Sequence, residues 1–300
     1  PLLTATLPEG SKKPLSKRKG TKKNLRGSAG KTKQDTSSQN STASLPNISI
    51  ASSEETQLPI ADDREVLFKP NAGPQTFFLA SSEREVLYGG AAGGGKSYAM
   101  LADPLRYMVH PQFSGLLLRH TTEELRELIW KSQELYPKIY PGIKWSERKM
   151  QWEAPSGARL WMSYLDRDED VLRYQGLAFS WIGFDELTQW HTPFPWNYMR
   201  SRLRTAASDL PIFMRATTNP GGPGHAWVKK MFIDPAPAGK SFWATDVETG
   251  KTLSYPVGHS REGQPLFKRR FIPAMLSDNP YLADGRDYET MLLSLPEHQR

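Results

Sequence analysis

The sequence predicts an α/β fold in which a mostly parallel β-sheet is flanked by helices, preceded by a disordered basic tail. Short apolar runs alternate with helical patterns, which favours such a sheet. A glycine-rich loop joins one apolar run to a helix, and residues 1–60 contain no aromatic side chain. Because so polar a segment cannot offset the entropy of ordering, we expect residues 1–60 to be disordered and residues 61–275 to form the folded domain.

The net positive charge of the chain comes from the tail. Residues 1–33 hold ten basic residues and one acid, a net charge of +9. Of the 39 Lys and Arg and the 32 Asp and Glu in the chain, this leaves 29 basic and 31 acidic residues, a net charge of −2, for the rest. A basic arm either solubilises a chain or contacts nucleic-acid phosphates, and both interpretations stay open.

Composition excludes several classes of protein. The chain has no Cys, so disulfides, thiolate zinc sites and cysteine nucleophiles are ruled out. No apolar stretch approaches the roughly 18 residues of a membrane helix, and no apolar core follows the basic N-terminus as it would in a secretory signal. We therefore expect a protein without a membrane partner.

The elements of the sheet follow from local patterns. Thr121 or Thr122 followed by Glu124 indicates the start of a helix. A hairpin is expected where two β-rich runs, 145–152 and 159–164, flank an Ala-Pro-Ser-Gly turn. The other predicted elements are the strands Glu85–Tyr88, Gly115–Arg119, Phe179–Phe184 and Ile212–Thr217 and the helices Ser97–Met108 and Thr121–Leu135.

The pattern G-x-x-x-x-G-K-S, from Gly90 to Ser97, lies between a predicted strand and a predicted helix. This context is typical of a phosphate-binding loop, in which glycines let backbone N–H groups surround phosphate oxygens. Lys96 would contact the β and γ phosphates of a nucleotide, and the Ser97 hydroxyl would bind Mg²⁺. The residues expected to bind the nucleotide here are Gly90, Gly93, Gly94, Gly95, Lys96, Ser97 and Tyr98.

A second acidic site follows the strand 179–184, which runs directly into Asp185 and Glu186. We expect Asp185 to hold Mg²⁺ through water and Glu186 to polarise the attacking water as the general base. A GTPase would need an [NT]KxD signature after the phosphate loop, but the match at 32–35 lies before it, in the tail. Nucleoside and shikimate-type kinases rarely combine the Asp-Glu pair with the third motif, described next.

The third motif is Thr217-Thr218-Asn219, which follows the strand 212–217 and precedes a glycine-rich loop. Small polar residues at this place can sense a γ-phosphate and pass hydrolysis into motion of the loop. With all three motifs, residues 65–300 resemble the large terminase subunit of tailed bacteriophages. The segments that carry the resemblance are GGAAGGGKS, YQGLAFSWIGFDEL, TTNPGGPGHAWVKKMF and FIPAMLSDNPYL.

The resemblance implies a P-loop NTPase fold of the ASCE, RecA-like class. It implies an ATPase, with ATP and Mg²⁺, that translocates double-stranded viral DNA into a procapsid. The implied partners are the portal protein, the small terminase subunit and further copies of the chain in a ring, expected as a pentamer. The implied location is the host cytoplasm, with transient docking on the procapsid.

The resemblance also implies roles for single residues. Thr217, Thr218 and Asn219 match the coupling motif of the family, and Gln75 matches an adenine-reading glutamine. A neighbouring subunit of the ring would donate an arginine finger, for which Arg173 is the candidate. Arg119 is a further candidate for a phosphate or domain contact. The remaining candidates for the finger are Arg200, Arg202 and Arg204.

One departure from the family concerns the nuclease. Large terminases usually continue into an RNase H-like nuclease with clustered Asp residues, so residues 276–300 are expected to be a linker toward such a domain. A solvated turn explains the acidic run at 166–170, and we expect no nuclease activity within these 300 residues. Two alternative functions stay open: a helicase-like ATPase that remodels nucleic acid, and a nucleotide-dependent scaffold that binds the portal or capsid.

Overall fold

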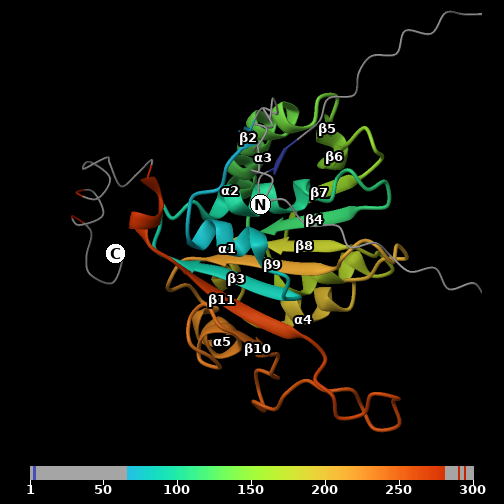
Figure 1. Ribbon diagram of the computed structural model, residues 1–300, viewed down its shortest axis with the longest axis vertical. Coiled ribbons are helices and arrows are strands. Elements are labelled where there is room, and N and C mark those ends of the chain that lie inside the picture. Colours follow the sequence, from blue (N-terminus) through green and yellow to red (C-terminus); the bar gives the residue numbers. More distant parts are fainter. Residues whose placement is uncertain (1–2, 5–65, 281–289, 291–293, 295–300) are drawn as a thin grey trace, which may run out of the picture. The chain divides into compact units, whose positions relative to one another are not determined.

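A nine-stranded sheet forms the centre of the fold (Figure 1). The computed structural model describes residues 3–4, 66–280, 290 and 294. The strand order is β10-β11-β3-β9-β8-β4-β7-β6-β5. Strands β11, β3, β9, β8, β4 and β7 run parallel to one another. Strand β10 at one edge pairs antiparallel with β11, and at the other end of the sheet β6 pairs antiparallel with both β7 and the edge strand β5. The predicted mostly parallel sheet is therefore confirmed, whereas the predicted disordered tail lies almost wholly outside the described residues.

Most elements follow one another along the chain with short connections, whereas residues 244–267 form a long connection between β10 and β11. The strands of the central sheet are β3 (Glu85–Gly90), β4 (Ser114–Arg119), β5 (Lys144–Ser146), β6 (Gln151–Glu153), β7 (Arg159–Tyr164), β8 (Trp181–Phe184), β9 (Phe213–Thr218), β10 (Ser241–Trp243) and β11 (Lys268–Ala274). The α-helices are α1 (Pro74–Ala80), α2 (Lys96–Leu105), α3 (Thr122–Ile139), α4 (Phe194–Arg200) and α5 (His225–Val228). The shorter helical segments are η1 (Glu147–Lys149), η2 (Asp168–Tyr174), η3 (Leu187–Gln189), the π-helix η4 (Lys229–Ile233) and η5 (Leu276–Asp278). A separate antiparallel pair consists of β1 (Leu3–Thr4) and β2 (Val66–Phe68).

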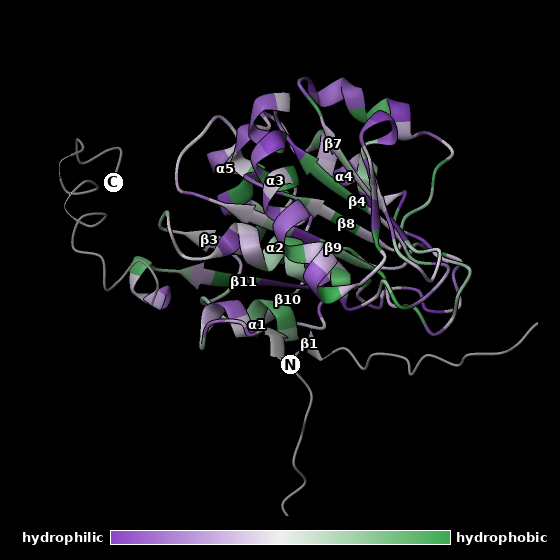
Figure 2. Ribbon diagram, turned by 90° about the horizontal axis from the view of Figure 1, so that it is seen from above, coloured by the Kyte–Doolittle hydropathy of each residue, from purple (hydrophilic) through white to green (hydrophobic). Residues whose placement is uncertain are grey.

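Two apolar layers bury the two faces of the sheet. Successive residues of a strand point to opposite faces, so Val86 and Tyr88 join one layer and Leu87 joins the other. Helices α1, α2 and α3 pack in the first layer, and η2, α4, α5 and η4 pack in the second. Figure 2 shows apolar, green stretches along the central strands and polar, purple stretches on helices such as α3. Among the described residues, no helix is both long and apolar enough to span a membrane.

The strand order gathers the predicted motifs at one edge of the sheet. Strand β9 comes late in the chain but lies between β3 and β8, and β4 lies on the far side of β8. The carboxyl ends of these four parallel strands carry the phosphate loop, the coupling motif, the Asp-Glu pair and Arg119. Ligands of open α/β sheets bind at this kind of edge.

The predicted strands 85–88, 115–119, 179–184 and 212–217 agree with β3, β4, β8 and β9 to within two residues at each end, and three larger differences occur elsewhere. Helix α3 begins with the predicted capping box, in which the Thr121 hydroxyl accepts from the Glu124 N–H at 3.3 Å, but it runs one turn past the predicted end. Helix α2 ends before Met108. The run 145–152 is not one strand, because η1 and Met150, with φ of 49°, divide it into β5 and β6.

A buried ion cluster fixes the start of β3. Glu85 is fully buried, and its carboxylate accepts from Arg200 Nε at 2.5 Å and from Arg269 Nε at 2.7 Å. Burial would raise the pKa of Glu85, but the two guanidinium groups outweigh burial and lower this pKa from 4.5 to about 2. The charged form of Glu85 therefore ties β11 and α4 to the strand that precedes the phosphate loop.

Replacing this carboxylate is expected to destabilise the fold. Glu85→Gln leaves the buried Arg269 without its countercharge, so the free energy of unfolding at pH 7 should fall by about 3–5 kcal/mol. The folded-state pKa is the lower one, so the contribution is fully present above pH 4.5 and is lost as pH falls from 4.5 toward 2. Urea unfolding at pH 7 and at several values down to pH 3 measures both effects. Equal stability of the two proteins at pH 7 would contradict this account.

Candidate nucleotide-binding site

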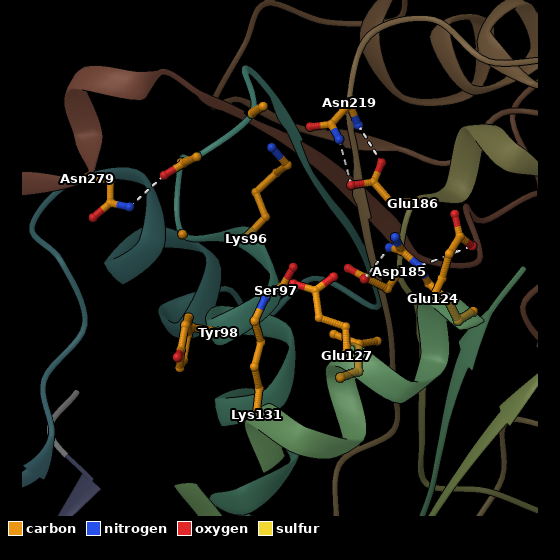
Figure 3. A pocket seen from close by; sticks show the side chains of 16 residues that line it. Lys96, Ser97, Tyr98, Glu124, Glu127, Lys131, Asp185, Glu186, Asn219 and Asn279 are labelled. Carbon is orange, nitrogen blue, oxygen red and sulfur yellow. Dashed lines mark hydrogen bonds and ion pairs between the residues drawn. The ribbon is translucent and has the colours of Figure 1, made fainter. Parts of the chain in front are cut away.

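A cavity of about 380 Å³ opens at the carboxyl ends of the parallel strands (Figure 3). Its wall combines the phosphate loop with acidic and basic side chains from α3, β4 and the end of β8, and with the amide side chains that follow β9 and β11. The residues that line it are Ala92, Gly93, Gly94, Gly95, Lys96, Ser97, Tyr98, Arg119, Glu124, Glu127, Leu128, Lys131, Asp185, Glu186, Asn219 and Asn279.

The phosphate loop, residues 90–97, joins β3 to α2 as predicted. Gly90 has φ of +141°, and a Cβ there would lie 2.1 Å from the carbonyl oxygen of Ala274, so only glycine fits. The same carbonyl accepts from the N–H of Ala91 at 2.9 Å. Gly90 therefore shapes the loop against β11 and does not line the cavity, whereas the other residues expected to bind the nucleotide do: Gly93, Gly94, Gly95, Lys96, Ser97 and Tyr98.

Lys96 is the cation inside this cavity. Its ammonium group donates to the carbonyl of Ala91 at 2.6 Å and to that of Gly90 at 3.3 Å, and the residue is buried. Burial lowers the pKa of Lys96, while the carboxylates of Glu186 and Asp185 oppose the shift. The hydrogen-bond partners of this buried positive charge are neutral carbonyls, so a bound anion would be a stronger partner.

Asp185 is held on both of its carboxylate oxygens. Oδ1 accepts from the Thr217 hydroxyl, and Oδ2 accepts from Arg119 Nη1 at 2.5 Å. Arg119 Nε also lies 3.5 Å from the carboxylate of Glu124. Arg119, at the end of β4, thus lies in the site and contacts both acids.

Glu186 turns away from Asp185 through its backbone. Its φ of 59° and ψ of 56° lie in the left-handed region, which is uncommon and costly for a residue other than glycine. The turn brings the Glu186 carboxylate to Asn219, whose backbone N–H donates at 2.9 Å and whose side-chain amide donates at 2.7 Å (Figure 3). The two adjacent carboxylates thereby have different positions and different hydrogen-bond partners.

The surroundings of Glu186 suit a general base. Burial raises the pKa of Glu186 above 4.5 and Asp185 adds to the shift, while Arg119, Asn219 and Lys96 oppose it. A carboxylate whose pKa is raised in this way takes up a proton more readily near neutral pH. Asn219 Oδ1 is buried and has no hydrogen-bond partner among the described residues, so it is available to accept from water beside this carboxylate.

The two threonines of the third motif act behind the cavity wall. Thr217 contacts the acidic pair, through Asp185 and through the N–H of Glu186 at 3.2 Å. The Thr218 hydroxyl donates to that of Thr188 at 2.9 Å. Of the three motif residues, only Asn219 lines the cavity.

The donor set fits a hydrated magnesium ion. Mg²⁺ prefers oxygen ligands and usually keeps several waters. Ser97 and Asp185 both line the cavity and both offer oxygen atoms, but each oxygen of Asp185 already accepts a hydrogen bond. The arrangement suits contact between Asp185 and the ion through water.

Gln75 lies outside the cavity wall. It is buried, and its amide is engaged at both ends: Nε2 donates to the carbonyl of Gly95 at 2.9 Å, and Oε1 accepts from the N–H of Asn71 at 2.6 Å. Reading adenine would require the exchange of these contacts, so the structure brings Gln75 to the phosphate loop itself.

The candidate finger arginines also lie outside the cavity. Arg173 is exposed, donates to the carbonyl of Tyr164 at 2.5 Å and lies 3.8 Å from Asp170. Arg200 binds Glu85 in the buried cluster, and Arg202 stacks on Tyr198. None of these arginines contributes to the cavity wall of its own chain.

Several cavity residues were missed by the sequence analysis. Glu124, Glu127, Leu128 and Lys131 share one face of α3 at helical spacing, and Lys131 pairs with Glu127 at 2.5 Å. A charged stripe on the helix that follows β4 is a signal that could have indicated them. Asn279 belongs to the stretch expected to be a linker, but it lies within FIPAMLSDNPYL, one of the segments that carry the resemblance, and this was a signal that could have indicated it.

The comparisons with known proteins agree with this geometry. A family model described as the terminase large subunit, T4-like virus type, N-terminal, matches residues 87–254, which is more than half of the chain. This match includes the phosphate loop, the Asp-Glu pair and the third motif. A search of curated proteins found no match.

Solved structures share the fold at low sequence identity. The large terminase of a thermophilic bacteriophage has a TM-score of 0.53 and 14% identity; the match covers 77% of this chain and 52% of that chain, so this chain spans about half of that protein. A point mutant of the large terminase ATPase domain of Thermus phage P74-26 has a TM-score of 0.50 and 13% identity. That match covers 77% of this chain and 90% of the phage domain. The large terminase of the first phage, in complex with ADP, matches with a TM-score of 0.51 and 13% identity. That match covers 75% of this chain and 51% of the phage protein.

Proposed function

The chain belongs to the large-subunit family of phage terminases, and from this premise we propose that it hydrolyses ATP to drive double-stranded DNA into a procapsid. The single observation that supports the chemistry most is the convergence in one cavity of Lys96, Asp185 and the Glu186–Asn219 pair. A cation for phosphate, an acid for Mg²⁺ and a buried base are the parts that phosphoryl transfer to water needs.

The phosphate side of the site is proposed to work by positioning and charge. Backbone N–H groups of the phosphate loop and the N-terminus of α2 surround the phosphates, and Lys96 leaves its carbonyl partners for phosphate oxygens. When bound at Ser97 and Asp185, Mg²⁺ would neutralise charge on the β and γ phosphates. Arg119 holds the Asp185 carboxylate in place.

The water side of the site is proposed to depend on Glu186. Its carboxylate accepts the proton of the attacking water, and Asn219 holds the carboxylate through two hydrogen bonds. Asn219 directly precedes the loop Pro220–Gly222. If loss of the γ-phosphate moves Glu186, its hydrogen bonds to Asn219 would pass the movement to that loop. The third motif would couple hydrolysis to movement in this way.

The partners are proposed from the family. The chain would act with double-stranded DNA, the portal protein and the small terminase subunit, in a ring of identical subunits, expected as a pentamer, on the procapsid in the host cytoplasm. Arg173 lies on the surface, where a neighbouring subunit could use it as the arginine finger. Gln75 would read adenine only if its present contacts were exchanged.

Phosphate release tests the proposed function. The chain should hydrolyse ATP slowly on its own in Mg²⁺, because an arginine from a neighbour is missing, and faster with procapsids and DNA. Packaging is measured in the same reactions as the amount of DNA that becomes protected from added nuclease. ATP binding without turnover in every mixture would favour the scaffold, and stimulation by DNA alone without packaging would favour a helicase-like ATPase.

A further inference from the structure

Three consecutive carbonyl groups of the phosphate loop each accept a hydrogen bond from a side chain outside the loop. The carbonyl of Gly93 accepts from Asn279 Nδ2 at 2.6 Å. That of Gly94 accepts from the Tyr88 hydroxyl at 2.8 Å. That of Gly95 accepts from Gln75 Nε2 at 2.9 Å and also from the N–H of Ala99, at 3.2 Å, as the first bond of α2.

The three donors come from three different parts of the fold. Gln75 is in α1, Tyr88 is in β3, and Asn279 follows β11 and η5. All three residues are buried. Figure 3 shows Asn279 beside the loop, on the side away from Glu186 and Asn219. Asn71 links two of the donors, because its N–H donates to Gln75 Oε1 at 2.6 Å and its side-chain amide lies 3.5 Å from Asn279 Oδ1.

The geometry of the peptide bond gives these contacts a consequence for phosphate binding. In a planar trans peptide the C=O and the following N–H point in opposite directions. Holding the carbonyls of Gly93, Gly94 and Gly95 toward the protein therefore turns the N–H groups of Gly94, Gly95 and Lys96 toward the cavity that these residues line. Glycine has more backbone conformations available than other residues. Without such contacts, the glycine-rich loop would lose more conformational entropy when it binds phosphate.

We propose that Asn279, Tyr88 and Gln75 are positioning residues that preorganise the phosphate loop for its ligand. This inference rests on the proposed function, since it concerns the same nucleotide site. It also makes the segment after β11 a working part of that site, because Asn279 is set by η5, where the N–H of Met275 donates to the Asp278 carboxylate at 2.6 Å.

Calorimetric binding of Mg²⁺-ATP and of inorganic tripolyphosphate tests the proposal, because tripolyphosphate has no base or ribose. Tyr88→Phe and Asn279→Ala should each lower the affinity for both ligands by about three- to ten-fold, the effect of one lost neutral hydrogen bond.

Each variant has a matched control. The control for Tyr88→Phe is Tyr140→Phe, which removes a hydroxyl that donates to the Leu105 carbonyl at 2.7 Å, away from the loop. The control for Asn279→Ala is Asn197→Ala, at an exposed position on α4. Thermal unfolding confirms that each variant is folded, and Asn279→Ala carries the test if Tyr88→Phe does not fold.

Gln75→Ala separates the two roles considered for that residue. Equal weakening of both ligands supports loop positioning, whereas weaker ATP with unchanged tripolyphosphate indicates base reading and removes Gln75 from the proposal. Wild-type affinity for both ligands in Tyr88→Phe and Asn279→Ala would overturn the inference. Failure of the wild-type chain to bind either ligand would instead overturn the proposed function.

Discussion

Replacing Glu186 with glutamine is expected to leave ATP binding intact and to lower ATP turnover by about 100- to 10,000-fold, the range for loss of a general base. The amide has the size of the carboxylate but cannot take a proton from water. The Asn219 contacts, at 2.9 and 2.7 Å, place the group and do not replace its basicity. Lys96 and the phosphate loop are untouched, so affinity for ATP should hold.

Two measurements on the same protein check this result. Equilibrium binding of ATP and single-turnover phosphate release separate affinity from chemistry. Glu123→Gln is the matched control, because Glu123 is an exposed acid in the first turn of α3 and does not line the cavity. Full turnover by Glu186→Gln would remove Glu186 from the role of base.

Replacing Lys96 with alanine should weaken binding of Mg²⁺-ATP by about 10- to 100-fold, as expected for loss of a hydrogen bond to a charged group. Lys96 supplies the buried cation of the loop, and its ammonium group donates to the carbonyls of Ala91 and Gly90. Removing it also removes a buried charge, so the folded state should not lose stability through an unpaired partner.

The measurement for Lys96→Ala is calorimetric titration with ATP and, separately, with ADP. The loss should be larger for ATP, because the γ-phosphate adds a contact that ADP lacks. Lys138→Ala, at the exposed end of α3, should bind both nucleotides as the wild type does. Unchanged ATP affinity in Lys96→Ala would mean that nucleotide does not occupy this loop.

The sequence predicted the parts of the site that are continuous along the chain. The phosphate loop and the Asp-Glu pair each follow an apolar strand, so residue type and neighbours together indicate their place. The capping box at Thr121 was predictable for the same reason, because it depends on residues three apart. Features of this kind depend on residues that are close together in the chain, so the sequence alone indicates them.

Contacts between distant segments could not be predicted. Asn279 and Gly93 are 186 positions apart, and Arg119 and Asp185 are 66 apart, so each pair meets only through the strand order. Strand β11 was missed because its Lys and Arg residues and Pro273 are unusual in a strand. Its Arg269 is nevertheless buried, since Glu85 supplies the countercharge. The left-handed backbone of Glu186 is likewise imposed by its surroundings, because glutamate rarely adopts it.

The most direct test is a crystal structure of the Glu186→Gln chain with ATP and Mg²⁺. We expect the β and γ phosphates to lie within the loop 90–97, Lys96 to contact phosphate oxygens, and Mg²⁺ to lie at the Ser97 hydroxyl with water between the ion and Asp185. We also expect Asn279 and Tyr88 to keep their bonds to the loop. A nucleotide bound elsewhere, or a γ-phosphate out of reach of residues 186 and 219, would contradict the proposed function of this site.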